Sequence, residues 1–124
     1  MTMVSEVMSR AVRAVSPHAS AEVAARAMDE WGLAFVPVCE DGRLLGVVTA
    51  RDIAVLTVAR GLPPSSTPVG YLMSANPFWC YEDQPYDEVL QSMDGRLPRR
   101  IPVVDRARRL VGMLSLGGTP TSPR

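Results

Sequence analysis

Residues 35–52 read FVPVCEDGRLLGVVTARD, and this stretch decides the fold. Two apolar runs, at 35–39 and 44–48, flank the turn residues at 40–43, which is typical of a β-hairpin. Thr49 and Asp52 then favour a helix start, because their side-chain oxygens accept hydrogen bonds from the free N–H groups of a first turn. A helix is expected over 53–60, with Gly61 ending it. The stretch therefore predicts a strand, a turn, a strand and a helix.

The same pattern recurs about 65 residues further along the chain. A shift of 65 places Met8-Ser9 on Met73-Ser74. The same shift places Val36-Pro37-Val38 on Ile101-Pro102-Val103. One extra residue in the DRARR turn then moves the shift to 66, and the runs at 100–104 and 109–114 form the second predicted hairpin. An internal repeat is thus the organising feature of the sequence.

A capped amphipathic helix is expected before each hairpin. In the first half Ser20 caps it, Gly32 ends it, and the predicted buried stripe is Val23, Ala24, Ala27, Met28 and Trp31. In the second half Asp83 is the expected cap, Gly95 the stop, and the stripe is Tyr86, Val89, Leu90 and Met93. Short strands at 14–15 and 78–81 precede these helices, which gives both halves one element order.

The predicted organisation is repeat 1 at 4–60, a Pro- and Ser-rich linker at 61–68, repeat 2 at 69–118 and a tail at 119–124. Repeats of about sixty residues bury only a marginal core alone. They are expected to pack on each other with pseudo-twofold symmetry, sheet against sheet with helices outside. The fold class is α/β (α+β), in which each repeat is a small sheet with helices on it.

Composition narrows the function classes. Thirteen basic side chains balance thirteen acidic ones, so nucleic-acid binding is not expected. Cys39 and Cys80 lack the spacing of a zinc or redox pair and are interpreted as buried structural thiols. His18 is interpreted as a surface turn residue. No segment has the features of a signal peptide or membrane span, so a cytoplasmic location is expected.

An h-P-V strand followed by a strand ending in G-h-h-T-x-x-D, here Gly46 to Asp52, resembles the CBS repeat. The resemblance covers about residues 4 to 118. Pairs of CBS repeats, or Bateman modules, bind AMP, ADP, ATP, S-adenosylmethionine or dinucleotides between the repeats and usually act as sensors. The resemblance therefore implies a regulatory module that binds an adenine nucleotide or adenosyl ligand, with no required cofactor.

The resemblance also implies the site residues. Asp52 would hold the ribose hydroxyls with Thr49 nearby, because a carboxylate accepts two hydrogen bonds from a vicinal diol. The R-h-P strand, Arg100 to Pro102, would close the same site. The candidates for binding phosphate are Arg51, Arg99 and Arg100. The candidates for the walls around the base are Val47, Phe78 and Trp79.

Structural alternatives remain open for these residues. Thr49 and Asp52 favour a helix start whatever the function, and Arg99 and Arg100 taken alone are typical of solvated charges at a strand end. In the second cleft the acidic position is Gly118, and Ala34-Phe35 stand where the first site has arginines. One functional site and one degenerate pocket are therefore expected.

The closing helix of repeat 2 is expected to be absent, because Gly118 leads into Thr119-Pro120. The apolar surface left uncovered predicts a homodimer. No nucleophile elbow, Walker-type loop or HExxH motif is present, so an enzyme is not expected. The alternative function is a ligand-free dimerisation or protein-interaction scaffold with decayed sites, and the regulated partner is not specified by the sequence.

Overall fold

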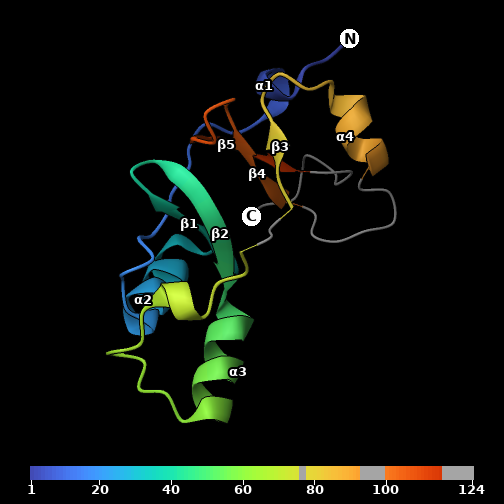
Figure 1. Cartoon of the computed structure of the whole chain (residues 1–124). Helices are drawn as coiled ribbons and strands as arrows, with labels where there is room; N and C mark the ends of the chain where they lie inside the picture. Colours follow the sequence, from blue (N-terminus) through green and yellow to red (C-terminus); the bar gives the residue numbers. More distant parts are fainter. Residues whose placement is uncertain (76–77, 93–99, 116–124) are drawn as a thin grey trace. The chain divides into compact units, whose positions relative to one another are not determined.

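The computed structural model describes residues 1–75, 78–92 and 100–115, and these form two compact units (Figure 1). The first-repeat unit comprises residues 13–77. The second-repeat unit combines residues 1–12 with residues from 78 onward. Each unit is mixed α/β with its own small sheet, as the repeat predicts, and the domain boundaries drawn from the repeat stay a prediction.

The predicted hairpin of the first-repeat unit is confirmed. Strand β1 (Phe35–Glu40) pairs antiparallel with β2 (Arg43–Thr49). Asp41 and Gly42 form the tight turn between them with φ of 55° and 80°, the left-handed pair that a two-residue hairpin turn requires. Val36, Val38 and Val48 lie fully buried in the core.

Helix α2 (Ala21–Trp31) is capped as predicted: the Ser20 hydroxyl accepts a hydrogen bond from the Val23 N–H, and Gly32 ends the helix in the left-handed conformation. Its buried residues are Ala21, Ala24 and Met28. The prediction that Val23 belongs to this stripe is wrong, because its side chain is 54% exposed. Val23 lies about 100° around the helix from Ala24, on the edge of the buried face.

Helix α3 (Ala50–Arg60) contains the predicted helical residues 53–60, begins directly after Thr49 and ends, as predicted, at Gly61 in the left-handed conformation. Ile53 and Thr57 face the core, and the Thr57 hydroxyl donates to the Ile53 carbonyl. The short 3-10 helix η1 (Val69–Tyr71) completes this core through the buried Val69.

The second-repeat unit contains a three-stranded sheet in the order β3-β4-β5. Strand β3 (Cys80–Tyr81) runs parallel to β4 (Arg100–Val104), and β4 pairs antiparallel with β5 (Leu110–Ser115), which confirms the second hairpin. Helix α1 (Val4–Val7) and helix α4 (Tyr86–Ser92) supply buried Val4 and Val89 to its core.

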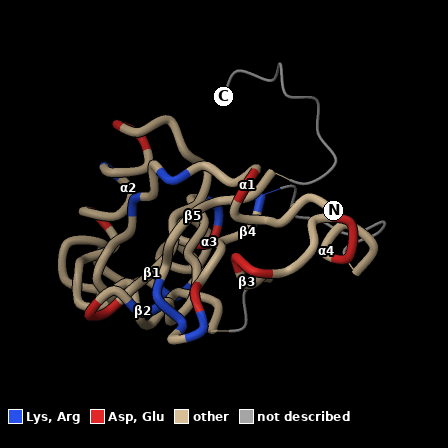
Figure 2. Tube along the Cα trace, turned by 90° about the horizontal axis from the view of Figure 1, so that it is seen from above, with Lys and Arg blue, Asp and Glu red and all other residues tan. Residues whose placement is uncertain are grey.

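The prediction that Asp83 caps α4 is wrong. The helix begins only at Tyr86, and the Asp83 carboxylate instead accepts two hydrogen bonds from Arg106. Figure 2 shows the acidic residues at the end of β3 and in the first turn of α4, where Asp87 and Glu88 complement the helix dipole. Met93, Gly95, the predicted missing helix and the 119–124 tail lie outside the described residues.

Each hairpin is extended by the Met-Ser segment that leads the other repeat. Ser74 and Val47 exchange two backbone hydrogen bonds of 2.8 and 3.1 Å in the first-repeat unit. Ser9 and Met113 do the same at 2.8 and 2.9 Å in the second. Gly46 lies next to the first pair and Gly112 next to the second. In both places the Met-Ser backbone can approach the hairpin closely, because glycine has no side chain.

Candidate functional site

The end of β2 and the first turn of α3 hold four of the predicted site residues. Thr49 is the N-cap of α3, and its Oγ1 accepts a hydrogen bond of 2.9 Å from the Asp52 N–H. Thr49 therefore does cap the helix, as the structural alternative predicts. It does not exclude a ligand role, because a hydroxyl that accepts one hydrogen bond still has a proton to donate.

Asp52 is partly buried in this turn, and its carboxylate accepts no hydrogen bond and forms no ion pair among the described residues. Val47 is partly buried one residue beyond Gly46, and Arg51 is exposed on α3. A carboxylate in the first helical turn is stabilised by the helix dipole. The turn thus presents a carboxylate acceptor whose lone pairs are available.

The remaining predicted residues lie in the second-repeat unit. Arg100 is exposed at the start of β4, whereas Pro102 is fully buried within the strand, so its ring contributes to the core. Phe78 is 38% exposed and Trp79 is partly buried. Arg99 and Gly118 lie outside the described residues, and the expected degeneracy of the second cleft stays a prediction.

Trp79 takes part in an aromatic and arginine cluster that the sequence analysis missed. Its ring meets that of Tyr81 edge to face, with centroids 4.9 Å apart. The Arg108 guanidinium lies 4.6 Å from the centroid of Trp79, and the Arg106 guanidinium 3.9 Å from that of Tyr81. One face of the expected base wall is therefore covered by a cation.

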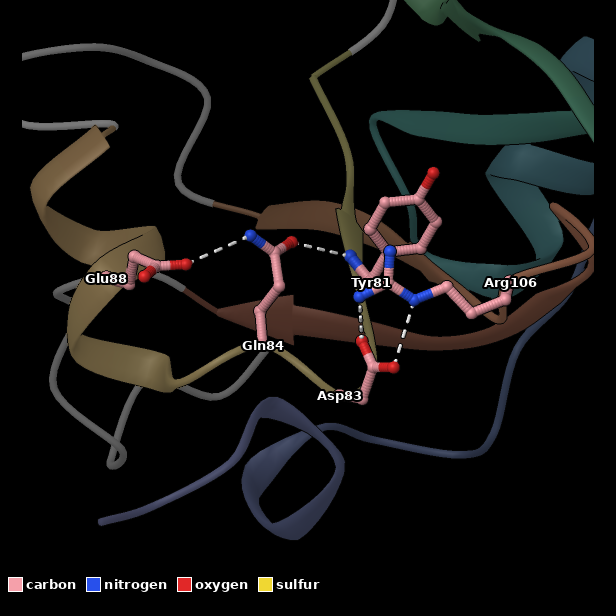
Figure 3. Close-up of polar contacts among 5 residues, drawn as sticks. All are labelled: Tyr81, Asp83, Gln84, Glu88 and Arg106. Atoms are coloured by element: carbon pink, nitrogen blue, oxygen red, sulfur yellow. Dashed lines mark hydrogen bonds and ion pairs between the residues drawn. The ribbon is translucent and has the colours of Figure 1, made fainter.

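Figure 3 shows how Arg106 is held: its Nε and Nη2 donate to the two Asp83 oxygens at 3.0 and 2.7 Å while the guanidinium lies beside the Tyr81 ring. This bidentate pair lowers the pKa of Asp83. Gln84 closes the same turn, because its Oε1 accepts from the Tyr81 N–H at 2.8 Å. The sequence pattern did not reveal the pairing of Asp83 with Arg106, because the two residues are 23 positions apart. The aromatic residues at 79 and 81 did indicate that two aromatic side chains share one face of the sheet.

His18 is exposed, as predicted, but it has a partner that spacing did not reveal. Its Nε2 lies 3.0 Å from Oε2 of Glu40, 22 residues away on the hairpin. Both side chains are largely in solvent, and pairs of this kind contribute about 0–1 kcal/mol. Within the described residues no three His, Cys, Asp or Glu side chains gather into a metal site.

Both cysteines are free thiols. Cys80 is buried and Cys39 partly buried, and burial raises the pKa of Cys39 to about 11 and that of Cys80 to about 12. Burial disfavours the thiolate, so ionisation of either thiol opposes folding. The stabilising contribution of each thiol is complete below pH 9, the ordinary pKa of cysteine. It falls as the pH rises from 9 toward the raised pKa of the folded protein.

We expect native Cys80 to react slowly with iodoacetamide at pH 8. A pKa raised from 9.0 to about 12 reduces its thiolate by roughly a thousandfold, and the 3% exposure of the residue reduces access further. Mass spectrometry of the labelled peptides, native against urea-unfolded, measures both rates. Cys39 should label faster than Cys80 in the native protein; equal native and unfolded rates at Cys80 would contradict its burial.

The chain contains the same hairpin twice, and in the first repeat its second strand leads into a helix capped by Thr49. This arrangement places the chain in the class of tandem α/β repeat proteins. The CBS domain family model matches this chain twice, at residues 4–57 and 69–117. The chain belongs to the CBS domain family and carries two of its domains in tandem.

Two bacterial relatives match along most of their length. The CBS domain-containing protein YhcV of Bacillus subtilis is 35% identical over 117 residues, which is 94% of this chain and 82% of the relative. Hypoxic response protein 1 of Mycobacterium tuberculosis is 32% identical over 116 residues, covering 93% and 80%. The similarity thus extends over most of each relative and is not confined to one part of a larger protein. No helix among the described residues is long and apolar enough to cross a membrane.

Solved structures resemble the fold closely. The crystal structure of Hypoxic Response Protein I, with two coordinated zinc ions, has a TM-score of 0.82 at 32% identity and covers 93% of this chain and 94% of its own. CBSX2 in complex with AMP has a TM-score of 0.80 at 25% identity, covering 94% and 92%. The CBS pair of protein MJ0100, with 5′-methylthioadenosine and S-adenosyl-L-methionine, has 0.76 at 27% identity, covering 93% and 90%.

Proposed function

We propose that this chain is a regulatory module that binds an adenosine-containing ligand and carries out no reaction of its own. The observation that carries the proposal is the Asp52 carboxylate, partly buried in the capped first turn of α3 with no hydrogen-bond partner among the described residues. A partly buried carboxylate gains from two donors, and the two hydroxyls of a ribose supply them. Relatives of this fold are solved with AMP and with S-adenosyl-L-methionine.

In this proposal Thr49 fixes the turn and offers its remaining proton, while Val47 supplies apolar surface. Arg51, exposed on α3, is the cation proposed for a phosphate group, and Arg100 in the other unit stays a prediction from the sequence. Phe78, with more than a third of its surface accessible, likewise stays a prediction for the wall around the base. Ligand binding would shift the population of conformations that a partner recognises.

The test is a set of thermal melts of nucleotide-stripped protein with AMP, ADP, ATP, NADH and S-adenosylmethionine. A ligand at a hundred times its Kd stabilises the native state by about 2.7 kcal/mol. We expect at least one ligand to raise the Tm by several degrees in the wild type and far less in Asp52→Ala or Asp52→Asn. Asp29→Ala, an exposed carboxylate on α2, is the matched control and should respond as the wild type does.

The proposal is wrong if Asp52→Ala leaves the affinity for every adenosine ligand unchanged. The alternative is then a ligand-free dimerisation scaffold, which is favoured by the apolar exposure of α3, where Val55 is 49% and Val58 80% accessible. A homodimer is proposed under either function. If the purified protein carries one bound nucleotide per site, the hypothesis of a ligand-free scaffold is wrong.

A further inference from the structure

The turn between β4 and β5 contains one arginine whose charge is not balanced by a neighbour. Arg106 pairs with Asp83, and Arg109 lies 3.5 Å from a carboxylate oxygen of Asp105. Arg108 has no carboxylate within ion-pair distance among the described residues, and its guanidinium lies over Trp79 instead. The turn therefore presents one guanidinium that still lacks an anion.

Arg108 occupies this position at a cost in stability. Its φ of 69° is left-handed, which suits glycine or asparagine better than a long side chain. Its Nε is buried and makes no hydrogen bond. Backbone strain and a buried unpaired donor in a single residue are features that are retained where a residue has a function.

The turn does not need the Arg108 side chain to form. The Arg108 N–H donates to the Asp105 carbonyl, the Asp105 N–H donates to the Arg109 carbonyl, and the Asp105 carboxylate accepts from the Ala107 and Arg109 N–H groups. None of these bonds uses the side chain at position 108, so glycine there would keep them. What the arginine adds is a charged plane fixed on an indole ring.

We infer that Arg108, lying on Trp79, binds the phosphate group of a ligand. A guanidinium donates through parallel N–H groups to two oxygens of one phosphate. Arg106, over the neighbouring Tyr81 ring, is already paired with Asp83, so Arg108 is the cation available to the ligand. A phosphate, with its larger charge and three terminal oxygens, offers one guanidinium more acceptors than a carboxylate does. The inference goes beyond the proposed function, because this site requires no adenine.

The fluorescence of Trp79 reports binding directly. Trp31→Phe leaves Trp79 as the single tryptophan. This protein is titrated with inorganic pyrophosphate, ADP and adenosine, and the titrations are repeated with Arg108→Gly. The control is Arg10→Gln, which removes the same charge from an exposed site in the same unit.

We expect Arg108→Gly to weaken pyrophosphate or ADP at least tenfold, to leave adenosine unchanged and to leave the Tm unchanged or higher, while Arg10→Gln changes none of them. A response to pyrophosphate identifies phosphate itself as sufficient, and a response to ADP alone identifies a nucleotide phosphate. If Arg108→Gly lowers the Tm, Arg108→Gln, which keeps the aliphatic stem, replaces it. Equal affinities in wild type and variant, or no binding of either phosphate compound, overturns the inference. The proposed function is tested independently, by the effect of Asp52→Ala on the binding of adenosine ligands.

Discussion

Replacing Gly46 by alanine is expected to destabilise the first-repeat unit by about 3 kcal/mol, because overpacking against backbone is costly. A Cβ at Gly46 would clash with the carbonyl oxygen of Ser74, which is backbone and cannot rotate away. The shift needed to relieve the clash strains both hydrogen bonds between Val47 and Ser74. For a chain of 124 residues the fall in Tm is roughly 10 °C, measured by circular dichroism.

Two glycine variants serve as controls for this result. Gly61→Ala meets no atom within 4 Å and is strained only by its φ of 64°, so it should cost about 1 kcal/mol. Gly112→Ala should fall between them, since its Cβ would meet the flexible Met8 side chain and lie 2.9 Å from the Ser9 carbonyl oxygen. A Gly46→Ala protein as stable as Gly61→Ala would show that the Met-Ser segment does not pair with β2.

Met28→Ala is the second large effect expected. Met28 is 2% exposed in the core formed by α2, β1 and β2, and it is among the largest fully enclosed side chains of the described chain. Truncation of a buried methionine costs about 2–5 kcal/mol through lost burial and the cavity left behind. Urea denaturation followed by circular dichroism measures the change in unfolding free energy.

Met28→Leu is the matched variant, since it nearly conserves volume and should cost less than about 1.5 kcal/mol. Val23→Ala, at a residue 54% exposed on α2, should change stability by less than about 0.5 kcal/mol. A loss below about 1 kcal/mol for Met28→Ala would mean that α2 does not pack on this hairpin as described.

Local chemistry made much of the fold predictable. The Asp41-Gly42 turn, the Ser20 cap, and Gly32 and Gly61 at helix ends are each determined by residues within four positions of one another. Val23 was misassigned because a five-residue stripe is broader than the face that small Ala21 and Ala24 present to the hairpin. Asp83 was misassigned because a cap motif cannot show that a distant arginine competes for the carboxylate.

The candidate site divides in the same way. Thr49 and Asp52 follow from the pattern that ends β2, since a cap and a first-turn carboxylate are local features. The burial of Pro102 and the cation on Trp79 are not local, because they depend on the pairing of β4 with β5 and on the conformation of the turn at 105–109. Proximity between residues 79 and 108 arises only when β3 pairs with β4.

By itself the sequence determined the repeat, both hairpins, the caps of α2 and α3 and the family, since each is encoded in residues that are neighbours along the chain. Only the tertiary structure decided which segment completes which sheet: residues 1–12 join the second repeat, and Ser74 pairs with the first. Both Met-Ser segments have the same pattern, so the sequence does not distinguish their partners. The choice is made by the backbone hydrogen bonds and the close approach to Gly46 and Gly112, which exist only once the chain has folded.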